Sequence, residues 1–428
     1  SFTSKGYRFD YGPSLFTMPH LVDQLFELFG EEASDYFKYI RKEVVCNYFW
    51  EDGMRFSVAA DEEKFVEEAA EAFSVTRGSI RNYLKANKAK YDLTGPIFLE
   101  KSLHKAKTFL NGRTLNALLH MGAFDLHTNL NKVNKRAFTD SKLVQLFDRY
   151  ATYNGSSPYR TPGIMSMIPH LEMHYGTFLP EGGMHAITRS IYDFALNQGI
   201  LFHFNEPVNA ILHADKQATG IKTITGDHNA DVIVSNMDIY STYKHLLPDV
   251  SAPKHIMRQE RSSSALIFYW GVRRSFPELE LHNILFSDDY KAEFAHIFEA
   301  GDVYEDPTVY INITSKDEPE DAPEGCENWF VMVNVPANTG QDWEMLKSQV
   351  RKSIINKVNR VLGVDLESHI ETEEILDPIR IEHDTSTHQG SLYGTSSNSK
   401  MAAFLRHPNF SGKLKNLYFV GGSVHPGG

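Results

Sequence analysis

Cysteine is nearly absent from this sequence, which has only Cys46 and Cys326 among its 428 residues. Two cysteines so far apart provide neither a disulfide framework nor the close spacing of a thiolate metal site. The sequence therefore favours a reducing compartment, and a cysteine-based redox or metal centre is not expected.

Long apolar runs and a basic excess are also missing. No run of about 18 apolar residues occurs, so no membrane-spanning helix is predicted, and no charged-then-apolar leader is present. Lys and Arg total 43 against 55 Asp and Glu, and the net charge of −12 argues against nucleic acid as a partner. Both ends of the sequence enter directly into patterned segments, so we expect the natural chain to continue beyond them.

Several catalytic motifs do not occur. The sequence has no G-x-S-x-G nucleophile elbow, no G-x-x-x-x-G-K-[ST] phosphate loop and no H-E-x-x-H zinc motif. The 19 histidines are scattered, which favours core and surface positions over a metal site. The G-x-G-x-x-G turn of a dinucleotide-binding βαβ unit is missing too. Serine hydrolysis, nucleotide hydrolysis and metal chemistry are therefore not expected.

The chain does carry a strand-then-glycine pattern at each end. Leu417 to Val420 predict a short buried strand, and glycines follow it; Gly6 to Ser14 has the same form. Glycines after a strand let the backbone approach a ligand closely, and they equally serve an ordinary tight turn. The two ends are candidates to frame one site.

The pattern between these ends is that of an α/β chain. Helices are predicted from Pro19 to Gly30, with an apolar stripe, and over 343–362, and a hairpin is predicted to turn at Asp52-Gly53. Apolar strands are predicted at 200–204, 264–272, 284–286, 308–313 and 329–335, and a mixed or antiparallel sheet is the economical arrangement. The length predicts two or more domains.

Four motifs carry a resemblance to a known family. They are GYRFDYGPSLFTMP at 6–19, YGTFLPEGGMHAI at 175–187, ADVIVSN at 230–236 and NLYFVGGSVHPGG at 416–428. In this order they resemble the carotenoid desaturases of the bacterial phytoene-desaturase type. The segments GPSLFTMPHLVDQLFELFG, VCNYFWEDG and SVHPGG are most similar to the 1-hydroxycarotenoid 3,4-desaturase branch.

This resemblance implies an amine-oxidase-like flavoprotein with an α/β fold. A Rossmann-like domain would hold FAD, and its N-terminal dinucleotide motif would precede the equivalent of Ser1. The discontinuous FAD-binding domain would comprise 1–20, 176–245 and 410–428. A mixed-sheet plus helical substrate-binding domain would comprise 21–175 and 246–409.

The resemblance also implies roles for individual residues. The cofactor-binding positions would be Gly12, Pro13, Ser14, Val208, Gly421, Gly422, Ser423, Gly427 and Gly428. Gly427 and Gly428 would open a helix whose N-terminus faces the cofactor, where oriented N–H groups favour negative charge. Turn geometry is an equal explanation for Pro13 and His425, and Val208 would be a buried strand residue in either case.

The implied reaction removes a hydride to the flavin and a proton from the neighbouring carbon of a polyene. His425 is the candidate catalytic proton acceptor, and Glu181, Asp10 and His388 are alternatives. A rigid apolar substrate requires an apolar tunnel, for which Tyr48, Phe49, Trp50, Phe268 and Trp270 are the candidate lining. Ordinary packing also explains those five aromatic residues.

The favoured substrate is a 1-hydroxycarotenoid. Phytoene or dehydrosqualene desaturation, carotene isomerisation and retinol-type saturation are alternatives, and a polyene carrier without cofactor is the non-enzyme alternative. Such an apolar substrate implies peripheral attachment to the inner membrane from the cytoplasm. The segments Val22 to Phe29 and Ala402 to Leu405 are candidates for contact with the membrane, or for ordinary packing against the core.

Overall fold

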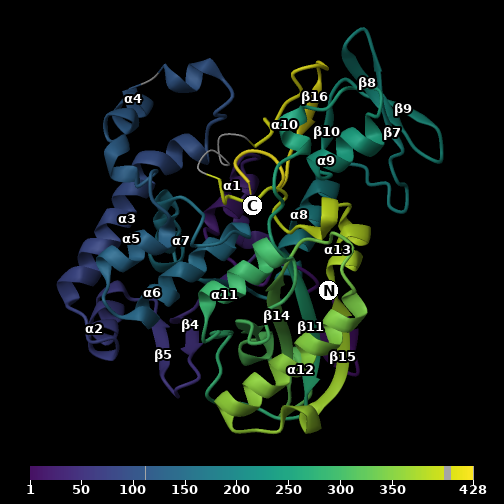
Figure 1. Ribbon diagram of the computed structural model, residues 1–428. Coiled ribbons are helices and arrows are strands. Elements are labelled where there is room, and N and C mark those ends of the chain that lie inside the picture. The colour runs from purple at the N-terminus through teal and green to yellow at the C-terminus, as the bar shows by residue number, and fades with distance from the viewer. Residues whose placement is uncertain (111, 400–405, 428) are drawn as a thin grey trace.

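The computed structural model describes residues 1–110, 112–399 and 406–427 (Figure 1). Gly428 and the segment Ala402 to Leu405 lie outside the described residues. Within those described ranges no helix is long and apolar enough to cross a membrane.

A seven-stranded mixed sheet organises the lower half of the molecule as drawn in Figure 1. Its strands, in spatial order, are β15 (Ile370–Leu376), β11 (Ser264–Val272), β14 (Glu327–Val335), β13 (Val309–Asn312), β12 (His282–Leu285), β4 (Val44–Phe49) and β5 (Arg55–Ala59). All neighbours are antiparallel except β12 and β4. The predicted mixed sheet and the hairpin at Asp52-Gly53 are confirmed.

The sheet forms because β11 and β14 are almost continuous apolar runs that are buried on both faces. They pair in register over nine residues, from Ser264 opposite Val335 to Val272 opposite Glu327. Helix α12 (Trp343–Leu362) packs its apolar stripe on one face of this sheet, so the predicted helix over 343–362 is confirmed.

A helical layer lies beside the β4–β5 edge of the sheet, at the left of Figure 1. It contains α2 (Glu62–Ala72), α3 (Arg77–Phe98), α4 (Gly112–Leu119), α5 (Leu130–Ala137), α6 (Ser141–Asp148) and α7 (Ile168–Met173). Side chains from α2, α3 and α6 share one buried cluster with Tyr48 and Trp50. The remaining helices are α1 (His20–Glu27), α8 (His185–Asn197), α9 (Ile239–Ser241), α10 (Lys254–Met257), α11 (Tyr290–Ala295) and α13 (Pro378–Thr385).

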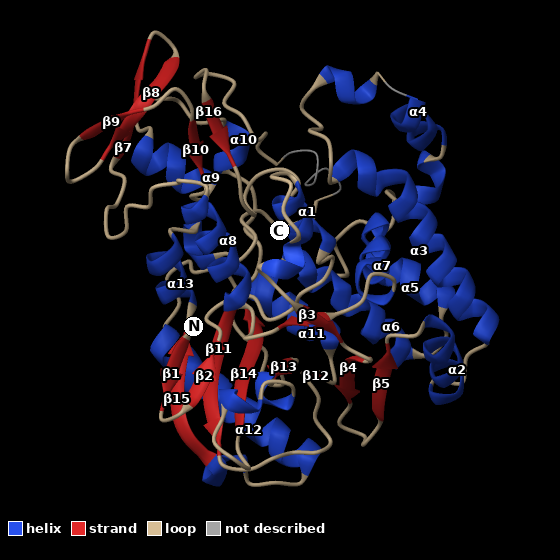
Figure 2. Cartoon of the chain, turned by 180° about the vertical axis from the view of Figure 1, so that it is seen from behind, coloured by secondary structure: helices blue, strands red, loops and turns tan. Residues whose placement is uncertain are grey.

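Four small sheets surround the large one: two at the top of Figure 2, one near its middle and one at the N-terminal end. They are the hairpin β1 (Phe2–Ser4) and β2 (Tyr7–Phe9), the pair β3 (Tyr39–Arg41) and β6 (Phe178–Pro180), the meander β7 (Ala210–Ala214), β8 (Gln217–Lys222) and β9 (Asp227–Asn229), and the parallel pair β10 (Ile233–Ser235) and β16 (Leu417–Phe419). Tyr7 and Phe9 pack on Ala265 and Tyr269 of β11, which fixes the N-terminal hairpin to the large sheet.

The strand predicted at 200–204 is wrong, because this segment forms no strand. Its apolar side chains Ile200, Leu201, Phe202 and Phe204 are exposed instead. A strand exists only through hydrogen bonds to a neighbour, and no strand of the described part of the chain pairs with this segment.

Helix α1 has the predicted position but a different environment. Pro19 precedes it and Gly30 follows it, as the sequence predicts. Phe26 is its buried residue, whereas Leu21, Leu25, Leu28 and Phe29 are exposed. The apolar stripe is real, but little of it packs against the protein.

Candidate functional site

The carboxyl ends of β10 and β16 lie side by side and define the candidate site (Figures 1 and 2). The two strands are parallel, with Ile233 opposite Leu417 and Ser235 opposite Phe419. Beyond the strand ends, Val420 N–H donates to the Ser235 carbonyl at 3.0 Å. The Ser423 hydroxyl accepts from Ile239 N–H at 2.9 Å. Ligands of open α/β sheets bind at this kind of edge, outside the carboxyl ends of the strands.

A cavity of about 500 Å³ opens at this edge. Its lining comes from the two strand ends and from the end of α13, and it consists of Asn236, Met237, Asp238, Asp384, Thr385, Ser386, Thr387, Leu392, Gly394, Gly422 and Ser423. Hydroxyl, amide and carboxyl groups dominate this lining. Such a cavity fits a polar ligand group better than an apolar polyene, whose site needs a largely hydrophobic wall.

Asp238 supplies an unused acceptor to the cavity. Its Oδ1 accepts from Tyr240 N–H at 2.8 Å and so caps the start of α9. The residue is only 4% exposed, and its buried Oδ2 has no hydrogen-bond partner in the described chain. Burial raises the pKa of this carboxyl, and nearby Arg261 opposes the shift. A ligand hydroxyl or N–H at the cavity would satisfy the free oxygen.

Arg406 holds the glycine turn from the buried side. Its guanidinium donates to the Gly422 carbonyl at 2.6 Å, to the Tyr393 carbonyl at 3.0 Å and to the Thr395 carbonyl at 2.9 Å. No carboxylate of the described residues pairs with it, and burial lowers its pKa to about 10. The turn is therefore backed by a buried cation without a counter-ion, which favours an anionic ligand.

Gly394 is placed where a side chain would interfere. Gly394 has φ +68°, and a Cβ there would lie 2.7 Å from the Cα of Ser423. Close backbone packing between these two loops therefore requires glycine at 394. Gly421 also has a positive φ, of +104°, and sits over the Asn236 carbonyl.

His425 is buried beneath the end of α3 and does not line the cavity. Its Nε2 lies 3.0 Å from the Lys101 carbonyl, and its ring contacts those of Phe98 and His104. A carbonyl only accepts, so Nε2 carries the hydrogen and the neutral ring has its lone pair on Nδ1. Burial lowers the pKa of His425, which keeps the ring neutral. Its Nδ1 has no partner in the described residues.

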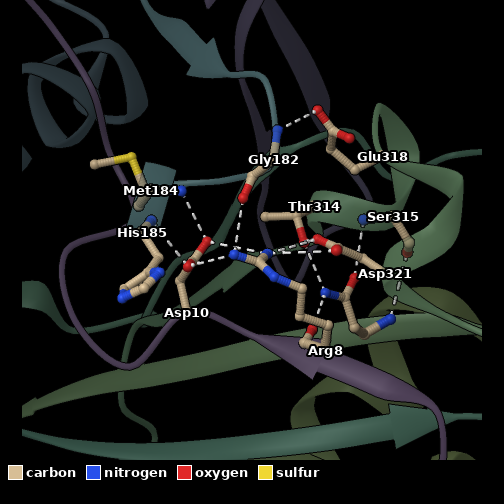
Figure 3. A network of polar contacts seen from close by, with 10 residues as sticks. Arg8, Asp10, Gly182, Met184, His185, Thr314, Ser315, Glu318 and Asp321 are labelled. Atoms are coloured by element: carbon tan, nitrogen blue, oxygen red, sulfur yellow. Dashed lines mark hydrogen bonds and ion pairs between the residues drawn. The ribbon is translucent and has the colours of Figure 1, made fainter. Parts of the chain in front are cut away.

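The N-terminal motif forms a separate polar network, shown in Figure 3. Asp10 accepts from Arg8 at 2.9 Å and from the N–H groups of Met184 and His185 at 2.8 and 3.1 Å. Arg8 also reaches Asp321 at 3.2 Å. A Cβ on Gly183 would lie 2.4 Å from Asp10, so glycine is required in that turn. Asp10 is thus engaged in joining the first hairpin to the start of α8.

The other N-terminal positions differ in their surroundings. Gly12 has open space where a Cβ would point, which suits close approach of a ligand. The Ser14 hydroxyl lies 3.0 Å from the Tyr310 hydroxyl, which in turn lies 2.8 Å from His282 Nδ1. Neither Gly12 nor Ser14 lines the large cavity, and Val208 packs beside the core cluster that contains Leu417.

The remaining alternatives for proton acceptance lie apart. Glu181 is exposed. His388 stacks on Tyr240 with ring centroids 3.5 Å apart, and burial together with Arg261 lowers its pKa to about 4.

The five aromatic residues expected to line a tunnel are all buried, but they face two different layers. Tyr48 and Trp50 face the helical layer, whereas Phe49, Phe268 and Trp270 pack beneath α12. The split follows from the alternation of side chains along a strand. None of the five lines the large cavity. In the described residues no group of three potential ligands could hold a metal ion.

Arg149 and Glu172 form a buried ion pair that sequence reasoning missed. Arg149 Nη2 lies 2.7 and 2.8 Å from the two carboxylate oxygens, and its Nε donates to the Tyr48 hydroxyl at 2.5 Å. Tyr153 donates to the same carboxylate at 2.6 Å. The pair therefore fixes Tyr48, one of the candidate tunnel residues. No motif links residues 149 and 172, so only their tertiary proximity shows it.

The whole chain, residues 1–428, matches the family described as flavin containing amine oxidoreductase. The chain belongs to this flavin-containing amine oxidoreductase family. It is 54% identical over 423 residues to a 1-hydroxycarotenoid 3,4-desaturase of Flavobacterium sp. (strain P99-3), covering 99% of this chain and 86% of that protein. It is 31% identical over 434 residues to a 4,4'-diapolycopene oxygenase of Methylomonas sp., covering 100% of this chain and 86% of that protein.

Solved structures share the fold of this amine oxidoreductase. An oxidoreductase from Methanosarcina mazei matches with a TM-score of 0.61 and 14% identity, covering 100% of this chain and 86% of the other. A putrescine oxidase variant matches with a TM-score of 0.57 and 11% identity, covering 95% and 80%. The predictions of an amine-oxidase-like fold and of an FAD-dependent oxidoreductase are confirmed.

Proposed function

We propose that this protein desaturates an acyclic carotenoid with FAD, and that its favoured reaction is 3,4-desaturation of a 1-hydroxycarotenoid. The observation that carries the proposal is the 54% identity with a 1-hydroxycarotenoid 3,4-desaturase over 99% of the chain. The four motifs behind the original resemblance, spread from 6–19 to 416–428, support the same assignment.

The residues around the large cavity fit FAD, whose diphosphate is anionic and whose ribityl and ribose groups carry hydroxyls. Gly422 and Ser423 line the cavity with Gly421 next to them, and buried Arg406 offers an uncompensated positive charge. The free Oδ2 of Asp238 would accept a cofactor hydroxyl. We assign Gly12, Pro13, Ser14, Val208, Gly427 and Gly428 to the same cofactor as expectations of the family motifs.

The reaction removes two hydrogens from adjacent carbons and leaves a double bond between them. When bound, FAD supplies the hydride acceptor. The protein must orient the polyene, exclude water and take the second hydrogen as a proton. His425 is our candidate acceptor, because its hydrogen bond to Lys101 leaves Nδ1 with a free lone pair. Tyr48 and Trp50 are our candidates for the apolar wall, with Phe49, Phe268 and Trp270 behind them in the sheet.

We divide the chain as the motifs imply. Residues 1–20, 176–245 and 410–428 would form the FAD-binding domain, and 21–175 with 246–409 the substrate-binding domain. The polar cavity at β10 and β16 is lined by residues of both sets, 236–238 and 422–423 from the first and 384–394 from the second, so on this division it lies where the two domains meet. Because the substrate dissolves in lipid, we also propose peripheral association with the inner membrane from the cytoplasm.

A carotenoid oxygenase is the second candidate, since the 31% identical relative carries that name. The two reactions leave different products: a desaturated carotenoid loses two hydrogens, whereas an oxygenated one gains oxygen. The higher identity of the desaturase relative favours the first reaction.

The test is expression of the protein in cells that accumulate phytoene, lycopene-type or 1-hydroxylated acyclic carotenoids, with pigment analysis by chromatography and mass. We expect the hydroxylated pigment to lose two hydrogens. Conversion of phytoene alone would reject the branch, and a gain of oxygen would favour the oxygenase. Unchanged pigments in cells whose purified protein shows flavin absorbance would reject desaturation. Pigment bound without flavin absorbance would identify a carrier.

A further inference from the structure

Helix α4 has the reverse of the polarity that is usual for a helix facing water. It buries Thr114 and Ala117 against the protein and exposes Leu115 and Leu119, by 58% and 77%. Leucines at i and i+4 lie on one face, so the side chains of Leu115 and Leu119 point together into solvent. A water-facing helix normally shows the opposite arrangement.

The exposed apolar surface continues on both sides of α4. Leu110 is 82% exposed, and Leu99, Phe109 and Met121 are also exposed. We call residues 99–110 and 112–121 the α4 segment. Large apolar side chains exposed in such number along one segment are a surface that a membrane or an apolar partner would cover.

Cations interleave with these apolar side chains. Lys101, Lys105, Lys107 and Arg113 are all exposed, and Glu100 is the single acidic residue of the α4 segment. Within the described chain none of the four cations forms an ion pair. The segment is therefore locally basic on a protein of net charge −12. Exposed leucine and phenylalanine among lysines are typical of segments that lie in the interface of an anionic membrane.

The charges separate this segment from α1, the other exposed apolar helix. Helix α1 also exposes leucines, but it carries Asp23 and Glu27, and Glu31 and Glu32 follow it. Carboxylates are repelled by an anionic surface. Of α1 and the α4 segment, only the α4 segment carries charge complementary to an anionic surface.

The α4 segment also touches the C-terminal motif. The Lys101 carbonyl accepts from His425 Nε2, and the Lys105 ammonium lies 5.7 Å from the centre of the Phe410 ring. Figure 1 shows α4 at the upper left of the molecule and α12 near the bottom.

We propose that the α4 segment docks the protein on an anionic lipid bilayer, with Leu110, Leu115 and Leu119 inserted among the lipids and the surrounding lysines and arginine at the headgroups. The proposal specifies the surface for the membrane association suggested under the proposed function, but its test needs neither carotenoid nor turnover.

The test is sedimentation of the purified protein with vesicles of phosphatidylcholine containing about a third phosphatidylglycerol, and with pure phosphatidylcholine. The variant Leu115→Asn/Leu119→Asn removes the apolar face, and Lys107→Gln/Arg113→Gln removes two charges. The matched controls are Leu25→Asn/Leu28→Asn on α1 and Lys291→Gln/Lys352→Gln, two exposed lysines of α11 and α12.

We expect tighter binding to the anionic vesicles, weakened by salt. The charge variant should bind about 25-fold more weakly, at about fivefold per cation, and the apolar variant about 100-fold more weakly, at about tenfold per leucine. Both controls should bind within about twofold of the wild type.

Equal binding by the wild type and the apolar variant would overturn the proposal. So would a loss of binding in Lys291→Gln/Lys352→Gln as large as that in Lys107→Gln/Arg113→Gln. A loss confined to the α1 control would assign docking to α1. If the α4 variants instead convert a dimer to a monomer in size-exclusion chromatography, the surface belongs to a second copy of the chain. If the protein desaturates its substrate in detergent but does not bind vesicles, docking is rejected and the proposed reaction is retained.

Discussion

The buried pair Arg149–Glu172 gives the sharpest stability prediction. Glu172 lies in α7, and its carboxylate is 2% exposed, whereas the Arg149 side chain is 9% exposed. Changing Glu172→Gln keeps the volume but leaves the guanidinium without its counter-ion in a site closed to water. Removing one partner of such a pair costs about 3–5 kcal/mol of the free energy of unfolding.

The expected shift in melting temperature follows from chain length. At about 2.1 cal/mol/K per residue, the unfolding entropy of this 428-residue chain is about 0.9 kcal/mol/K. The loss therefore corresponds to about 3–6 °C, measurable by calorimetry or by circular dichroism. Tyr48 should also become mobile, because Arg149 holds its hydroxyl.

A surface pair provides the matched control. Arg160 and Glu260 form a two-pronged pair at 2.9 and 2.7 Å, yet both side chains are more than a third exposed. Glu260→Gln should cost less than about 1 kcal/mol. The double variant Arg149→Met/Glu172→Gln should recover part of the loss, because no buried charge then lacks a partner. Equal melting temperatures for Glu172→Gln and Glu260→Gln would refute the reasoning.

Two further predictions concern the cavity and pH. Gly394→Ala should lower the flavin content of the purified protein, because the added Cβ would lie 2.7 Å from Ser423 and this overpacking costs about 1–3 kcal/mol. The control Gly412→Ala, whose Cβ meets nothing within 4 Å, should retain the wild-type visible absorbance. Burial raises the pKa of Glu293 from 4.5 to about 7, so the folded state favours the protonated carboxyl. The resulting contribution to stability is fully present below about pH 4.5 and is lost as pH rises through about 7. Between about pH 5 and 8 the wild type should lose up to ~3 kcal/mol relative to Glu293→Gln in denaturant titrations, and parallel pH profiles would contradict this.

Continuous apolar runs were the most predictable part of the fold. Strands β11 and β14 follow from their composition, because an apolar run of that length is stable only when buried between neighbours. The segment 200–204 has the same local pattern and forms no strand. Local sequence specifies the capacity to pair, whereas a partner strand is a property of the whole fold.

The same distinction explains α1. Its periodicity correctly predicts one apolar face, but periodicity does not say what covers that face, and here most of it is open to solvent. Periodicity does not predict the α4 segment for a related reason: Leu115 and Leu119 have the spacing of core positions, but the structure buries Thr114 and Ala117 and exposes both of these leucines.

The glycine motif at 421–423 was visible in the sequence, but its buried support was not. Asp238 and Arg406 are single charged residues with no motif spacing. Arg406 donates to the Gly422 carbonyl, and Asp238 shares the cavity lining with Gly422 and Ser423, so only the tertiary structure brings them to the turn. Isolated charges are usually solvated, so sequence alone favours a surface position for both. The unpartnered Asp238 oxygen and the unpaired Arg406 become visible only when burial is known.

The two proposals together assign different approaches to cofactor and substrate. The large cavity has a polar lining from Asp384 to Thr387 and from Asn236 to Asp238, which suits the sugar and diphosphate groups of FAD and disfavours a polyene. The α4 segment reaches the C-terminal motif from another side, through the hydrogen bond between His425 and Lys101. On the two proposals, a lipid-dissolved substrate would enter beside the α4 segment, which contacts His425, rather than through the polar cavity. Because the same contact fixes the His425 tautomer, docking and proton acceptance would share one structural element, and a disturbed α3 end should impair both.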